Sequence, residues 1–177
     1  MYKRKKLTGT NYDDTIVREK IISFFKDMWD IDLIPHPKQR KIDLLGVDDP
    51  ELGVEVEHGH WKGDFWKTPS YCDISGQDFP TLNMPIRKEK YWKEYIMWYG
   101  KLKHNPSWKK NIFVRTNDDF SQIMVVRPEV LSDPDKTLKT TFQANNCNEL
   151  EDWISFKREN VEVYNLINEK YILEENG

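Results

Sequence analysis

The clearest pattern of apolar and polar positions is a helical stripe that begins near Asp13. Apolar side chains recur there at helical spacing, and the stripe consists of Val17, Ile21, Phe24, Phe25 and Met28. This period places them on one face of a helix. Asn11 or Asp13 is the candidate N-cap residue, and the helix is expected to end near Trp29 or Asp30.

The next apolar runs have the length and the flanking turn residues of strands. A short strand is expected within 31–37, where two prolines close the run. Two better-marked strands follow at 42–47 and 53–58. Because the residues between them begin with Asp48, Asp49 and Pro50, the pair predicts a β-hairpin with a five-residue loop.

The middle of the chain changes from an irregular pattern to a helical one. Residues 59–85 are rich in Gly, Pro, Trp and Asp and show no sustained period. A connection of this length is typically functional or poorly ordered. From Ile86 to Lys103 an aromatic stripe returns at helical spacing, so a second helix is expected there.

Strands dominate the remainder. Two β-rich runs, 111–116 and 122–127, flank a turn at 117–119. A further strand is expected at 161–166 and a short helix at 149–156. The order of helix, strands, helix and strands predicts a mixed α/β domain.

Length and composition favour one globular domain. The chain has 177 residues, of which 38% are hydrophobic and 13% aromatic, enough for a sizeable core. Residues 1–127 carry 22 Lys/Arg against 19 Asp/Glu, a balance of +3, and residues 128–177 carry 5 against 11, a balance of −6. We therefore expect a core over 1–127 with a basic N-terminal arm, and an acidic C-terminal extension over 128–177 packed on the same domain.

Several classes of protein are excluded by what the chain does not contain. No apolar run approaches the roughly 20 residues of a membrane span. The basic N-terminus lacks the apolar stretch of a secretory signal. Cys72 and Cys147 stand alone in sequence, which fits a reducing cytoplasm better than a disulfide scaffold.

Three acidic residues in the predicted hairpin are the candidate chemistry. If Val47 faces Gly53 across the turn, Asp43 lies opposite Glu57, and Glu55 is its diagonal neighbour on the same face. Val54 and Val56 then point to the opposite face, toward a core. Opposed like charges destabilise a hairpin, and a divalent cation such as Mg²⁺ is the natural offset. The alternative is a solvated acidic face, but neither strand pairs these acids with Lys or Arg on that face.

These residues resemble the motif of the PD-(D/E)XK nuclease superfamily, also called restriction-endonuclease-like. Asp43 in KIDLLGV matches the first acid of that motif and Glu55 in GVEVEHG matches the second. The position that normally holds Lys is Glu57, a variant found in some restriction enzymes, and the leading Pro is missing. The resemblance covers roughly residues 12–127 through element order. It implies an α-β-β-β-α-β core in which a mixed central sheet is flanked by helices.

The resemblance also implies an activity. Asp43 and Glu55 would bind Mg²⁺ or Mn²⁺, and Glu57 would be a further metal ligand or the general base. The protein would then be an endonuclease that hydrolyses phosphodiester bonds in DNA, acting in the cytoplasm, in a phage or restriction context, and as a homodimer if it cuts both strands. Without the motif lysine, the candidate cations are Lys62, Lys67, Lys88 and Lys90, and Lys88 is preferred.

Basic and aromatic residues beyond the hairpin suit contacts with nucleic acid. The residues chosen for this role are His60, Trp61, Lys62, Lys67, Arg87 and Lys90. Cations and aromatic rings interleaved in this way match backbone contacts and base stacking. The competing interpretation is that the tryptophans pack on the domain edge and the lysines are solvated. A zinc site at His58 and His60 is disfavoured for lack of a third ligand, and Glu19 is a candidate outer acid that fits a solvated helix face better.

Two other functions remain open from the sequence. The first is a catalytically inactive nuclease-fold module that binds nucleic acid or a protein partner, and Glu57 in place of Lys keeps it open. The second is an acidic inhibitor whose residues 128–177 imitate nucleic acid charge.

Overall fold

The structure is a computed structural model. It describes residues 14–37, 42–49, 51–59, 63–67, 81–85, 110–131, 133–143 and 150–175. The second helix that the sequence predicts, over 86–103, lies outside the described residues.

The first element is helix α1 (Asp14–Trp29), which confirms the helix predicted from Asp13. The apolar stripe becomes its buried face, with Ile21, Phe24 and Phe25 almost fully buried. The chain leaves the helix at Asp30, whose φ of 52° is left-handed, a common way for a helix to end.

Seven strands form the main sheet. They are β1 (Leu33–Pro35), β2 (Leu44–Gly46), β3 (Gly53–His58), β5 (Asn111–Thr116), β6 (Gln122–Val126), β9 (Glu162–Ile167) and β10 (Lys170–Leu173). Their order is β1-β2-β3-β5-β6-β9-β10. All neighbours are antiparallel except β3 and β5, which run parallel.

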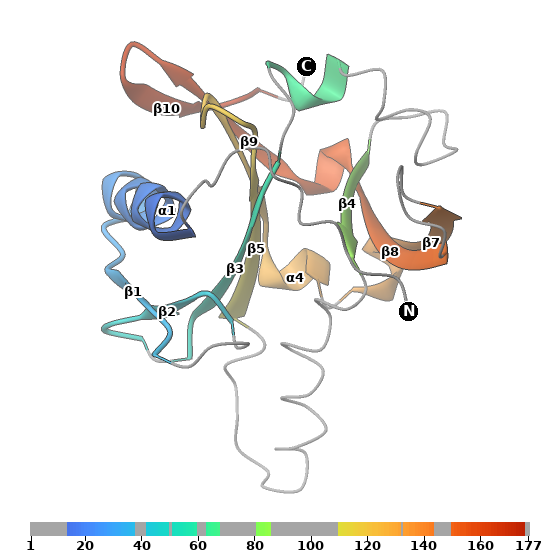
Figure 1. Cartoon of the computed structure of the whole chain (residues 1–177), viewed down its shortest axis with the longest axis horizontal. Coiled ribbons are helices and arrows are strands. Elements are labelled where there is room, and N and C mark those ends of the chain that lie inside the picture. The colour runs from blue at the N-terminus through green and yellow to red at the C-terminus, as the bar shows by residue number, and fades with distance from the viewer. Residues whose placement is uncertain are drawn as a thin grey trace, which may run out of the picture.

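A second sheet of three antiparallel strands has the order β4-β8-β7. Its strands are β4 (Thr81–Pro85), β7 (Thr137–Gln143) and β8 (Leu150–Lys157). The short helical turns are η1 (Phe65–Lys67), α4 (Pro128–Leu131), η4 (Pro134–Lys136) and η5 (Arg158–Asn160). Figure 1 shows three layers: α1 on one side of β3 and β5, and the smaller sheet on the other.

Each face of the main sheet has its own core. Under α1, alternate residues of the central strands such as Val54, Val56 and Val114 pack with the apolar stripe of the helix. On the other face, Phe113 and Met124 pack with residues of β4, β8 and η1. The central strands are therefore covered on both sides, as the apolar runs 112–114 of β5 and 123–126 of β6 require.

The mixed α/β class, the two strands of the predicted hairpin and the strands predicted at 111–116, 122–127 and 161–166 are confirmed, with small shifts of their ends. The helix predicted at 149–156 is wrong, because this segment is strand β8. β8 pairs with β4 on one side and with β7 on the other. Pairing on both edges outweighs the local helical tendency of this short segment.

The sequence prediction also treated all of 59–85 as irregular, but β4 lies at its end. β9, from the acidic extension, pairs directly with β6 and so belongs to the main sheet. No helix in the described ranges has both the length and the apolar character that crossing a membrane would require.

Two tyrosines connect α1 to β9 and β10. The rings of Tyr164 and Tyr171 each meet Phe24 edge-on, with centroids 5.1 Å apart. Burial and a hydrogen bond to Glu162 raise the pKa of Tyr164 to about 12. Burial, with a smaller contribution from Asp119, raises the pKa of Tyr171 to about 12.

The contribution of Tyr164 and Tyr171 to the free energy of unfolding should fall at alkaline pH. Because the fold raises the pKa of these phenols above the unfolded value of about 10, their stabilising effect is complete below that pH and is lost as the pH rises toward about 12. Urea unfolding at about pH 8 and about pH 11 measures the loss. Tyr171→Phe should cost about 1 kcal/mol at the lower pH, through its bond to the Phe120 carbonyl oxygen, and should show a smaller alkaline loss. Equal losses in both proteins would contradict this account.

Candidate functional site on strands β2 and β3

The hairpin that carries the acids has a different register from the predicted one. Leu44 pairs with Val54 and Leu45 with Gly53, so the prediction that Val47 faces Gly53, with Asp43 opposite Glu57, is wrong by two residues. Continuing the observed register by one residue puts Asp43 level with Glu55.

The turn explains the shift. The Gly46 amide donates to the Leu52 carbonyl oxygen, so the turn begins directly after Gly46. A Cβ at Gly46 would lie 2.3 Å from the carbonyl oxygen of Asp49, and only glycine permits this approach. A shift of two residues keeps every side chain on its face, so the predicted faces of β3 are unaffected.

Glu55 and Glu57 lie on the face of β3 that looks away from α1. Their partners on β5 are Phe113 and Arg115, and Phe113 belongs to the core between the two sheets. Glu55 is only 2% exposed. Val54 and Val56 point into the core under α1, as the sequence predicted.

Asp43 directly precedes β2 and contacts both α1 and β3. One carboxylate oxygen, Oδ2, accepts a hydrogen bond of 2.9 Å from the Val56 amide. The other, Oδ1, lies 3.3 Å from Nη2 of Arg18, which is on α1. The carboxylate thus extends the β2–β3 ladder just before β2 begins, and both of its oxygens have donors.

The three acids are not assembled around one point. Across the described parts of the chain, no three His, Cys, Asp or Glu side chains are grouped as a metal site requires. The chemistry of the donors nevertheless suits Mg²⁺ or Mn²⁺, which bind carboxylate oxygens. One oxygen of Glu57, Oε2, is buried and has no hydrogen-bond partner within the described residues. Glu55 and Glu57 therefore fit a cation site, whereas Asp43 is engaged by Arg18.

Most of the predicted nucleic-acid contacts lie outside the described residues. These are His60, Trp61, Lys62, Arg87 and Lys90, and the preferred catalytic lysine, Lys88, also lies outside the described residues. Lys67 ends η1, with its side chain 83% exposed and 3.7 Å from Asp64. Glu19 is exposed on α1. His58 bonds Thr116 at 2.7 Å and stacks on Phe120, a residue of the core under α1, so it faces away from Glu57.

Arg115 is a charged residue of this face that the sequence prediction missed. It is the register partner of Glu57 on β5, and its guanidinium carbon lies 5.5 Å from the centre of the Phe65 ring. The available signal was a single charged residue in the strand NIFVRT, directly after the apolar run 112–114. What the sequence could not supply was the pairing of β5 with β3.

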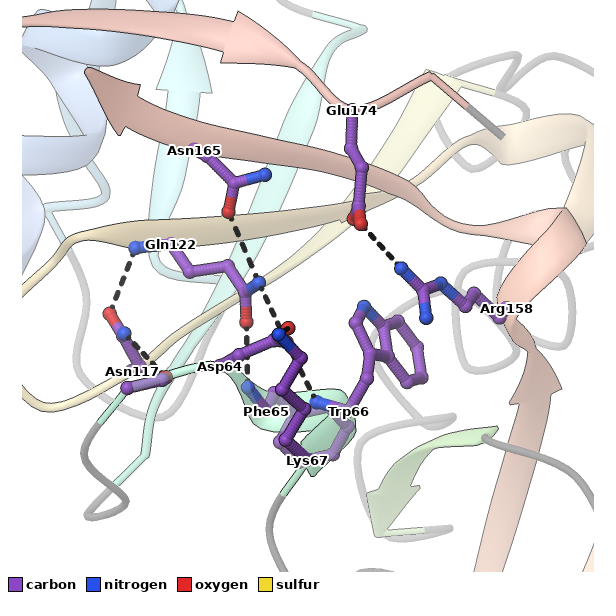
Figure 2. Close-up of polar contacts among 10 residues, drawn as sticks. Asp64, Phe65, Trp66, Lys67, Asn117, Gln122, Arg158, Asn165 and Glu174 are labelled. Carbon is purple, nitrogen blue, oxygen red and sulfur yellow. Dashed lines mark hydrogen bonds and ion pairs between the residues drawn. The ribbon is translucent and has the colours of Figure 1, made fainter. Parts of the chain in front are cut away.

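Buried amides beside this face hold the segment that contains η1, as Figure 2 shows. Oε1 of Gln122 accepts a hydrogen bond from the Phe65 amide at 3.0 Å. Its Nε2 donates to Asp64 and to Asn165, both at 3.2 Å. Gln122 is 3% exposed, and its bond to the Phe65 amide is buried.

Asn117 extends the same network. Its Nδ2 donates to the Gly63 carbonyl oxygen at 3.0 Å and to Ser121, and its Oδ1 accepts from the Gln122 amide. The β5–β6 turn therefore binds the backbone of residues 63–65 through two buried side chains. The start of the predicted irregular region is thus fixed against the sheet.

Trp66 is held from the other side. The Arg158 guanidinium lies 5.2 Å from the Trp66 ring and forms an ion pair with Glu174 near the chain end (Figure 2). Trp66 is buried, which favours the edge-packing interpretation for this tryptophan over base stacking.

Gln122→Leu should release η1 while leaving the sheet intact. The change leaves the Phe65 amide and the side chains of Asp64 and Asn165 without their Gln122 partner. We therefore expect the free energy of unfolding to fall by about 2–4 kcal/mol. Urea unfolding measures this cost, and trypsin cleavage after Lys67 should become faster because the segment opens locally. Glu129→Gln, at an exposed position of α4, is the control. A variant as resistant to trypsin as the wild type would contradict the anchoring role.

The chain was also compared with known proteins. No protein-family model, no curated protein and no solved structure matches it.

Proposed function

We propose that the protein is a Mg²⁺-dependent endonuclease that hydrolyses phosphodiester bonds in DNA. The observation that carries the proposal is the placement of Glu55 and Glu57 on one face of a central strand, with Asp43 at the adjoining end of β2. The order of elements is compatible with the core of the nuclease superfamily that the sequence resembles. Helix α1 is followed by β1, β2 and β3, and then by β5, which runs parallel to β3.

Electrostatics supports a cation at this face. A carboxylate buried in the middle of a sheet loses solvation worth several kcal/mol, and Glu55 is almost completely buried. Glu57 follows two residues later on the same face and adds a second negative charge. A bound divalent cation lowers the cost of both charges.

Each acid has a role in this proposal. Asp43 and Glu55 would hold the ion, which when bound polarises a phosphate oxygen and lowers the pKa of a coordinated water. Glu57 would be a further ligand or would take a proton from the attacking water. Asp43 would have to exchange its contact with Arg18 for the ion. Lys88, the lysine preferred from the sequence, lies outside the described residues, so its role stays a prediction.

DNA as the substrate, a homodimer for cutting both strands, and action in the cytoplasm in a phage context belong to the same proposal. They rest on the resemblance and on the residues selected from the sequence.

A second function is favoured by one specific observation. Both oxygens of Asp43 already have donors, and the described residues contain no assembled group of three metal ligands. A nuclease-fold module that binds nucleic acid or a protein partner without cutting would keep this arrangement permanently.

Cleavage assays separate the two functions. Supercoiled plasmid and labelled oligonucleotides are incubated with the full chain in Mg²⁺, Mn²⁺ or EDTA. Cutting should require the metal, and Asp43→Asn and Glu55→Gln should each lower the rate by at least about 100-fold, since each removes a charged ligand. Glu51→Gln is the matched control, because Glu51 lies on the same hairpin but pairs with Lys110 and should leave the rate unchanged. If the protein binds DNA but cuts it with neither Mg²⁺ nor Mn²⁺, the result would favour the nuclease-fold module that binds without cutting.

Metal binding itself should respond to Arg18. Arg18→Gln removes the cation that competes for Asp43, so we expect Mn²⁺ affinity measured by calorimetry to rise by about two- to tenfold. Arg127→Gln, which alters an ion pair with Glu162 instead, is the control. Unchanged or weaker Mn²⁺ binding in Arg18→Gln would exclude Asp43 from the ligands.

A further inference from the structure

We propose that Arg115 binds the phosphodiester group that is cleaved. It would supply the positive charge that the motif lysine supplies in the nucleases that this sequence resembles. This inference rests on the proposed function. It concerns a residue that lies on neither strand of the acidic hairpin.

The parallel ladder places Arg115 directly beside Glu57. The ladder runs without interruption from Gly53 and Asn111 to His58 and Thr116. Paired residues of neighbouring strands are about 5 Å apart and share a face. Arg115 therefore lies on the face of Glu55 and Glu57, next to the second acid. On its other side Arg115 pairs with Met124 of β6, which is apolar.

The guanidinium group lies against an aromatic ring. Its carbon lies over the Phe65 ring at 5.5 Å, a distance at which a cation is attracted to an aromatic face. The Phe65 ring is buried, and the Phe65 amide is bound by Gln122. The buried network of the β5–β6 turn thus positions the ring, and the ring supports Arg115.

Arginine suits the task by its chemistry. It remains protonated throughout the physiological pH range and presents five donors in a planar fork that matches phosphate oxygens. The fork is large enough to interact with a neighbouring carboxylate and with a phosphate oxygen at once. Arg115 is partly exposed although its Nε atom is buried, so an anion would have to meet its terminal nitrogens.

The reaction requires a cation at this point. The oxygen of water forms a bond to phosphorus while the water gives up a proton to Glu57 or to solvent, one phosphorus–oxygen ester bond breaks, and the leaving oxygen takes up a proton. Negative charge grows on the non-bridging oxygens in the transition state. A donor fixed in advance at these oxygens stabilises that charge without reorganisation and is worth about 10²–10³ in rate.

The test uses the full chain and three measurements: single-turnover cleavage of a labelled DNA duplex in Mg²⁺ or Mn²⁺, DNA affinity in EDTA, and thermal unfolding. Arg115→Gln should slow cleavage by about 100-fold or more while weakening DNA affinity by less than about tenfold, because its effect lies in the transition state. Arg115→Lys should cleave at an intermediate rate, since it keeps the charge but not the fork.

Two further variants separate catalysis from folding. Phe65→Leu keeps an apolar side chain but removes the aromatic face, and should slow cleavage by about three- to tenfold through misplacement of Arg115. Arg127→Gln is the matched control, because Arg127 packs on Trp29 of α1, away from the carboxylate face. It should lower the unfolding midpoint but leave the cleavage rate of the folded protein unchanged.

The outcomes distinguish this assignment from the proposed function. If the wild type cuts DNA in no metal, both fall together. If the wild type cuts and a folded Arg115→Gln cuts within about threefold of it, Arg115 has only a structural role and the nuclease proposal stands. Arg115→Lys as slow as Arg115→Gln would also overturn the role of the charge. If Arg115→Gln does not fold, wild-type rates in Arg115→Lys and Phe65→Leu overturn the assignment, and reduced rates support it.

Discussion

β3 and β5 pair in parallel over six residues each, although 58 positions separate His58 from its partner Thr116. A parallel pair cannot be joined by a tight turn, so a long connection has to leave the sheet and return. Residues that are distant in sequence therefore meet along one face, with Glu57 next to Arg115. The same pairing brings the β5–β6 turn against η1, where Gln122 and Asn117 bind the backbone of residues 63–65.

This arrangement decides the electrostatics of the candidate site. The central strands are covered on both faces, so the side chains on either face of these strands point toward a core. Glu55 lies in this environment at 2% exposure, where an ionised carboxylate is costly unless other charges offset it. Both an Arg on the next strand and a divalent cation reduce this cost. The proposed nuclease uses both, with the cation on the acids and Arg115 on the phosphate.

Local sequence information was sufficient to predict the elements whose structure depends on residues close in sequence. The helical stripe of α1 and the turns at Asp48–Asp49 and at Asn117–Asp119 are set by neighbouring residues. The alternation of β3 also placed Val54 and Val56 in the core correctly. The register of the hairpin was not predictable in this way, because it depends on how closely the Asp49 carbonyl oxygen approaches Gly46. Strand β8 and the position of Arg115 depend on partners far away in sequence, which no local pattern contains.

In the proposed nuclease, stability and activity would compete at Asp43. Its carboxylate ties the end of β2 to Arg18 of α1 and to the Val56 amide, so the fold gains from keeping it where it is. An ion shared with Glu55 would need at least one of those oxygens. The partly exposed Arg18 is the partner that is easier to exchange, because such an ion pair contributes at most about 1 kcal/mol, whereas leaving the Val56 amide without an acceptor would cost more. In the proposed nuclease, the site would therefore assemble only when the cation binds, and the acids would not have to converge beforehand.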